Sequence, residues 1–142
     1  FLGSEFSFED MERQRVADFE ILELAVDELE QESVRRVSVR PRYESAYAVS
    51  DYLISPSDCF ILEIRHHKVA GSPPFKIIST PRSHVKIIEG VPIATRSEAR
   101  SLESDRRTVI RFTGTRIDPG FSRRYFEPSI LERLSGLPGL PR

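Results

Sequence analysis

The chain has 142 residues, of which 39% are hydrophobic and 30% are charged, and this composition excludes an intrinsically disordered chain. The sequence contains no run of eighteen apolar residues and no charged segment followed by an apolar one, so it predicts neither a transmembrane helix nor a secretory signal. Its single cysteine, Cys59, excludes an internal disulfide. We therefore expect an intracellular location, cytoplasmic or organellar.

The formal net charge of −1 conceals two oppositely charged parts of the chain. Residues 1–32 contain eleven Asp or Glu and two Arg, whereas residues 33–142 contain nineteen Lys or Arg and eleven acids. Residues 1–6 include Gly-Ser-Glu-Phe, which has the form of a cloning junction, so they could be a leader left by cloning or processing. We expect residues 7–142 to form a single domain with an acidic part at 7–33 and a basic β-rich body at 34–113.

The acidic part carries the signals of a helix. Ser7 can cap it, and Asp10 completes a capping box. A 3–4–3 spacing then places four apolar residues on one helical face: Phe19, Leu22, Val26 and Leu29.

The same stretch also alternates as a strand would, because Leu22, Leu24 and Val26 are separated by single residues. Its length, the absence of Gly and Pro, and its helix-forming composition favour a helix. We predict an amphipathic acidic helix over about 8–32. Its apolar face would pack on the sheet of the same molecule, or alternatively pair with a second helix in a short coiled coil.

The sequence of the body, residues 34–113, predicts a series of short strands separated by turns. Runs of β-branched and aromatic residues predict strands at 34–40, 46–54, 60–65, 75–80, 84–89 and 108–113, with 75–80 and 84–89 forming a hairpin. Residues 95–107 are polar and could form a short surface helix. In the last part, 114–142, we expect a loop, a short helix at 130–135 and an extended tail. Without regular βαβ alternation the fold class is α+β: a helix packed on a small antiparallel sheet or barrel of five to six strands.

Catalytic motifs are lacking. Cys59 and the three histidines, His66, His67 and His84, coexist without a spacing that indicates a nucleophile or a metal site. His66 and His67 would point to opposite faces of a strand and could not chelate one ion together. No glycine-rich phosphate loop, paired CxxC, HExxH or GxSxG is present. We expect no enzyme activity, no cofactor and no metal.

Two clusters combine cations with rings and define the candidate partner surface: Arg35, Arg36, Arg40, Arg42 and Tyr43, and Arg123, Arg124 and Tyr125. Such residues can bind acidic protein surfaces, or phosphates and bases of single-stranded RNA. They are also typical of a solvated edge beside core aromatics. The preferred hypothesis is a non-enzymatic protein-interaction or structural module, a subunit or domain of a larger assembly whose oligomeric state the sequence leaves open. The alternatives are an RNA-binding and a phosphoinositide-binding module.

Overall fold

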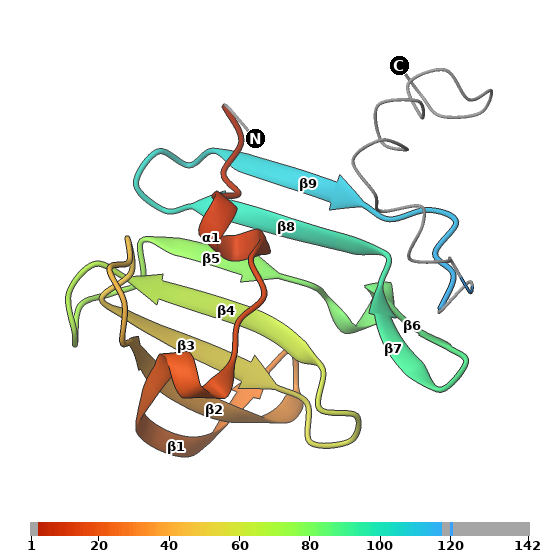
Figure 1. The fold of residues 1–142 in the computed structure, drawn as a ribbon, viewed down its shortest axis with the longest axis horizontal. Helices are drawn as coiled ribbons and strands as arrows, with labels where there is room; N and C mark the ends of the chain where they lie inside the picture. Colours follow the sequence, from red (N-terminus) through yellow and green to blue (C-terminus); the bar gives the residue numbers. More distant parts are fainter. Residues whose placement is uncertain (1–2, 118–119, 121–142) are drawn as a thin grey trace.

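The computed structural model describes residues 3–117 and 120, and these form a predominantly β structure (Figure 1). The helical parts are short: α1 (Phe8–Met11) and two 3₁₀ turns at Val16–Asp18 and Arg82–His84. The strands are β1 (Phe19–Leu29), β2 (Glu32–Pro41), β3 (Val49–Ile54), β4 (Ile61–His67), β5 (Lys76–Ser79), β6 (Val85–Ile88), β7 (Val91–Ala94), β8 (Arg96–Ser101) and β9 (Arg107–Arg111).

Seven of these strands make one antiparallel sheet in the order β1-β2-β3-β4-β5-β8-β9. Each strand pairs with its neighbour along the chain, except that the β6–β7 hairpin projects from the sheet between β5 and β8. The connections range from the tight turn at 30–31 between β1 and β2 to the loop at 68–75 between β4 and β5. β1 and β9 are therefore the two edges of an open sheet (Figure 1).

The helix predicted over about 8–32, and with it the α+β class, is wrong. Its first turn exists, since Ser7 caps α1 and forms the expected capping box with Asp10. However, α1 ends after four residues, and Phe19–Leu29 is the eleven-residue edge strand β1. Within residues 3–117 no helix reaches seven residues, and the main sheet has seven strands rather than five or six.

Two local features explain why the strand resembles a helix in the sequence. The register shifts between Ile21 and Glu23, so Leu22 lies in a bulge and the period-two alternation is interrupted. The hairpin then turns at Glu30 and Gln31, whose φ angles are 50° and 68°. Turns of this kind are usually marked by Asn-Gly or Asp-Gly. Here Glu30 and Gln31 adopt left-handed conformations without a Gly, Asn or Asp. The sequence therefore has none of the residues from which a hairpin turn is usually predicted.

The structure also tests the strands and helices that were predicted after residue 33. A strand is present where 60–65 predicted one, as β4. The surface helix expected at 95–107 is wrong, because these residues form β8 and its turn into β9. The hairpin expected from 75–80 and 84–89 is also wrong, since β5 pairs with β4 and β8 while β6 pairs with β7. The expected helix at 130–135 and the extended tail lie outside the described residues.

The two faces of the sheet differ in chemistry. Residues directly opposite each other in an antiparallel pair share a face. The register therefore places Val37, Tyr52, Ile64 and Ile78 on one side, which we call the inner face because residues 3–18 cross it. Figure 1 shows this N-terminal segment running over the sheet from β9 toward β1. The opposite, outer face carries many charges, among them Glu23, Arg36, Arg40, Asp51 and Arg65.

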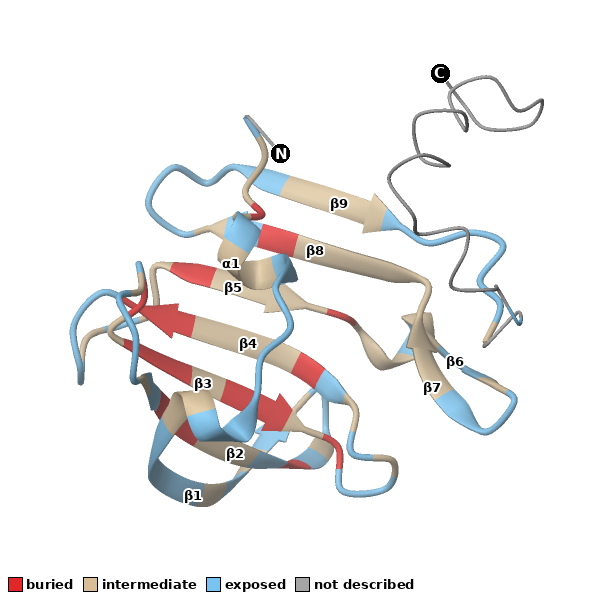
Figure 2. Cartoon of the chain, viewed as in Figure 1, coloured by how far each residue is buried: buried red, intermediate tan, exposed pale blue. Residues whose placement is uncertain are grey.

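Burial is concentrated in the middle of the sheet. Figure 2 shows buried segments on β3, β4, β5 and β8, whereas β1 is intermediate or exposed along its length. Val34, Leu53 and Leu62 form a buried apolar cluster, against which Leu29, Phe60 and Val85 pack. The centre of the sheet is thus a stable platform, and the β1 edge leaves apolar surface in contact with water.

Candidate functional site

A buried polar cluster fastens the N-terminal segment to the inner face. The Asp10 carboxylate, which is fully buried, accepts hydrogen bonds from Lys76 Nζ at 2.5 Å, from Tyr47 OH at 2.7 Å and from the Ser7 amide at 2.6 Å. Lys76 Nζ also donates to Tyr47 OH at 2.8 Å. Lys76 belongs to β5, so these bonds fix α1 over the centre of the sheet.

The protonation states follow from burial and hydrogen bonding. Burial alone would raise the pKa of Asp10, but hydrogen bonds from Lys76, Ser7 and Tyr47 outweigh it and hold that pKa below its usual value. The His66 ring stacks on Tyr47 with 3.7 Å between ring centroids, and burial lowers its pKa to about 4. His66 is therefore neutral near pH 7. Its Nδ1 lies 2.8 Å from the Ser50 hydroxyl. Its buried Nε2 has no hydrogen-bond partner among the described residues and lies 3.5 Å from Asp10 Oδ1.

An apolar cavity of about 330 Å³ lies farther along the same face, toward the β1 edge. Its sheet side is lined from β1, β2 and β3 by Phe19, Ile21, Val37, Val39, Tyr52 and Ile54. Residues 14–16 of the N-terminal segment form the remaining wall. One hydrogen bond joins the two sides, since Tyr52 OH donates to Gln14 Oε1 at 2.6 Å.

Apolar surface continues from this cavity along the hairpin. Ile21, Leu24 and Val26 are 52%, 71% and 64% exposed although they are large and apolar. A second hollow of about 440 Å³ is lined by Leu24, Ala25, Val26, Arg35 and Arg36. Contiguous exposed apolar surface of this kind commonly marks a binding site. The cavity and the exposed residues beside it therefore form the candidate site.

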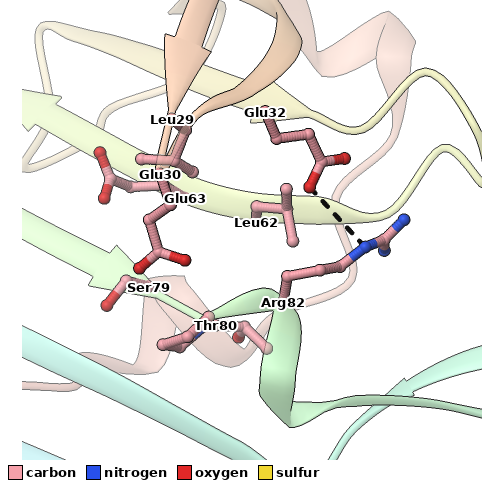
Figure 3. A pocket seen from close by; sticks show the side chains of 9 residues that line it. Leu29, Glu30, Glu32, Leu62, Glu63, Ser79, Thr80 and Arg82 are labelled. Carbon is pink, nitrogen blue, oxygen red and sulfur yellow. Dashed lines mark ion pairs between the residues drawn. The ribbon is translucent and has the colours of Figure 1, made fainter.

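A smaller pocket lies near the turn between β1 and β2 (Figure 3). It measures about 80 Å³ and is lined mainly by polar residues, including Glu30, Glu63 and Thr80. Arg82 fills one side through an ion pair with Glu32 at 3.8 Å and a closer one with Asp58 at 2.7 Å. A water molecule occupies about 30 Å³ in the liquid, so this pocket has room for a few waters and not for a large ligand.

The sheet separates the basic residues that the sequence grouped into one surface. Arg36 and Arg40 lie on the outer face, where Arg36 pairs with Glu23 at 3.0 Å and Arg40 pairs with Glu20 at 3.2 Å. Arg42 and Tyr43 follow β2, and their side chains donate to the Phe19 carbonyl and to Glu9. Arg35 lies on the inner face. Arg123, Arg124 and Tyr125 lie outside the described residues.

The predicted helical face is also divided, because its residues belong to a strand. Phe19 and Val26 lie on the inner face of β1, Leu22 lies in the bulge, and Leu29 packs against the core cluster of the outer face. The residues that the sequence did not single out are Lys76, Tyr47 and Tyr52. In the buried polar cluster, Asp10 had a sequence signal, its place in the capping box.

The thiol and the imidazoles do not converge. Cys59 is exposed in the turn before β4, and His67 bonds on the outer face to Asp51 at 3.0 Å and to the Ser72 carbonyl at 2.7 Å. Among residues 3–117 and 120 there is no group of three His, Cys, Asp or Glu side chains suited to a metal ion. The same part of the chain has no helix of the length and apolarity needed to cross a membrane.

A family model described as "-like: Uncharacterized protein" matches residues 1–133. The chain belongs to this family. No curated protein matches the chain. Two solved structures share the fold of this family member, each with a TM-score of 0.80.

The first of these is described as an outer membrane lipoprotein-sorting protein domain from Vibrio parahaemolyticus. It is 16% identical, and the match covers 94% of this chain and 56% of that one. The second, a DUF1329 family protein from Desulfovibrio piger ATCC 29098, is 21% identical, with 92% and 55% covered. The chain thus spans little more than half the length of either protein, and the matches establish its fold.

These matches correct two further predictions. A lipoprotein-sorting domain shares the fold, which contradicts the assembly-module hypothesis and both alternatives, RNA and phosphoinositide binding. The expected intracellular location, which rested on the single cysteine and on the absence of a secretory signal, is contradicted as well, because that neighbour is described as an outer membrane lipoprotein-sorting protein domain. Neither neighbour's description names an enzyme.

Proposed function

We propose that this chain binds the acyl chain of a lipid or lipoprotein on the inner face of its sheet, as part of a bacterial envelope protein that shields such chains from water. The apolar cavity between residues 14–16 and strands β1 to β3 carries the proposal. The lipoprotein-sorting description of a structural neighbour supports it and suggests the envelope location.

The size and lining of the cavity suit one acyl chain. A volume of about 330 Å³ falls at the lower end of the range for small-molecule sites, which are mostly apolar with a few polar groups. Each buried methylene contributes about 0.8 kcal/mol, so about ten of them would contribute roughly 8 kcal/mol, equivalent to micromolar affinity before ordering costs. The exposed stretch Ile21–Val26 would let a longer chain continue along the hairpin.

The fold also supplies a way to admit a chain. The N-terminal segment is fastened by buried contacts at Phe6 and Asp10, but residues 11–17 are exposed and meet the sheet mainly through the Gln14–Tyr52 hydrogen bond. This stretch can move away from the cavity while α1 stays in place. Loops that close over binding sites are typically such weakly held segments.

A titration with a neutral fluorescent monoacylglycerol tests the proposal. Val37→Trp would fill the cavity from β2, and we expect it to weaken binding at least tenfold. The matched control is Ile87→Trp on β6, a 60% exposed apolar position away from the cavity, which should leave the affinity unchanged. Circular dichroism of both variants checks folding. No saturable binding by the unaltered chain, or equal loss in both variants, would refute the proposed site.

A further inference from the structure

Arg35 is a cation placed on an apolar face. It pairs in register with Val26 of β1 and with Ile54 of β3, so its side chain shares the inner face with both. Ile54 lines the 330 Å³ cavity, and Arg35 itself lines the second hollow beside Leu24 and Val26. The guanidinium group is therefore next to the surface along which an acyl chain would lie.

Among the described residues, Arg35 differs from Arg36 and Arg40 of the same hairpin because its side chain has no ion-pair or hydrogen-bond partner. Arg36 and Arg40 pair with carboxylates of β1 on the outer face. Arg35 is exposed, and within the described part of the chain it forms neither an ion pair nor a side-chain hydrogen bond. The nearest acid by register is Glu28, at the end of the hairpin diagonally across from Arg35, and the two do not pair.

We infer that the acyl ligand carries an anionic headgroup whose carboxylate or phosphate oxygens pair with Arg35. This inference rests on the proposed function and narrows the ligand to a single-chain lipid anion. An arginine fork binds either group through two parallel N–H donors, and it remains charged at any physiological pH.

Arg15 is the rival cation, because it lines the cavity from the N-terminal segment. Its surroundings favour an anion less, since the neighbouring Asp18 carboxylate accepts a hydrogen bond from the Arg15 amide at 3.1 Å. Within the described part of the chain, no carboxylate accepts a hydrogen bond from Arg35. The two sites are separable by substitution, because one lies on β2 and the other on the N-terminal segment.

Displacement of the neutral fluorescent monoacylglycerol tests the inference. The competitors are hexadecanoate, hexadecyl phosphate and the neutral 1-hexadecanoylglycerol, all used below the concentrations at which they form micelles. We expect the anions to bind about tenfold more tightly than the neutral lipid. Arg35→Gln should abolish that preference while neutral binding persists, Arg35→Lys should restore part of it, and the outer-face control Arg40→Gln should leave it intact.

The outcomes separate the inference from the proposed function. Equal binding of neutral and anionic chains, or a preference that Arg15→Gln removes and Arg35→Gln does not, would overturn the role of Arg35 while acyl binding stands. If the fluorescent probe itself does not bind, there is nothing for a competitor to displace. That result would refute both the proposed acyl binding and the role of Arg35. Tighter binding of hexadecyl phosphate than of hexadecanoate would identify a lipid phosphate as the headgroup, and the reverse order a free fatty acid.

Discussion

Replacement of Asp10 by Asn removes the charge that fastens the N-terminal segment to the sheet. Asp10 is the only carboxylate within 4 Å of Lys76 Nζ among the described residues, and both side chains are almost fully buried. The variant keeps the shape of the side chain and its place in the capping box, but it leaves the Lys76 ammonium group buried without a counter-ion.

The expected cost follows from the burial of the pair. Removing one partner of a buried ion pair typically costs about 3–5 kcal/mol, because the remaining charge is desolvated and unpaired. Most domains of this size have a free energy of unfolding of about 5–15 kcal/mol, so the variant should lose a large fraction of its stability. Removing both charges, in Asp10→Asn with Lys76→Met, leaves no buried ion. We expect the double variant to be more stable than the sum of the two single losses predicts, by about 2–3 kcal/mol.

Urea unfolding followed by circular dichroism at pH 7 measures all three variants. Arg40→Gln is the matched control, because it breaks an exposed pair with Glu20 that should contribute no more than about 1 kcal/mol. A loss below about 1 kcal/mol in Asp10→Asn, or strictly additive losses in the double variant, would show that the buried pair does not hold the segment in place.

Three further predictions concern the turn, the core and the pH dependence. Glu30→Asn with Gln31→Gly relieves two left-handed residues and should raise the melting temperature by about 3 °C in calorimetry, whereas an unchanged value would contradict the turn geometry. Leu53→Ala empties a fully buried position and should lower the free energy of unfolding by about 2–5 kcal/mol in urea titrations; a loss under 1 kcal/mol would argue against the core cluster. The pKa of His66 is about 6.5 in the unfolded chain and about 4 in the folded protein. The free energy of unfolding should therefore fall by about 3 kcal/mol as the pH drops from 6.5 to 4. His66→Gln should remove this dependence of stability on pH.

Most strands of the main sheet could be predicted from the sequence, but β1 and β8 could not. In β4, Leu62 and Ile64 alternate with Glu63 and Arg65, and the sequence predicted a strand at this position. β1 also alternates, but the bulge at Leu22 shifts the phase, and the result matches a helical 3–4–3 spacing equally well. The local propensity of these residues favoured a helix, but their pairing with β2 stabilises a strand. Strand propensity depends on such cross-strand contacts more than on the residues themselves.

The candidate site could not be predicted from the sequence either, because β1 was interpreted as a helix. Phe19 and Val26 do lie on the same face of β1, but the helical interpretation grouped them with Leu22 and Leu29, which do not share that face. Likewise, the charge pattern placed Arg35 and Arg36 together, although successive strand residues point to opposite sides of a sheet. Once β1 and β2 are paired, one arginine faces carboxylates and the other faces apolar side chains.

Site-resolved methyl NMR with an acyl ligand tests the central claim most directly. Ile and Val methyl groups labelled with carbon-13 would be observed while hexadecanoate is added below its micelle concentration. We expect shifts at Ile21, Val37, Val39 and Ile54, which line the cavity, and none at Val85 or Ile87 of β6. Shifts confined to β6 and β7, or spread evenly over the molecule, would contradict an acyl-binding site on the inner face.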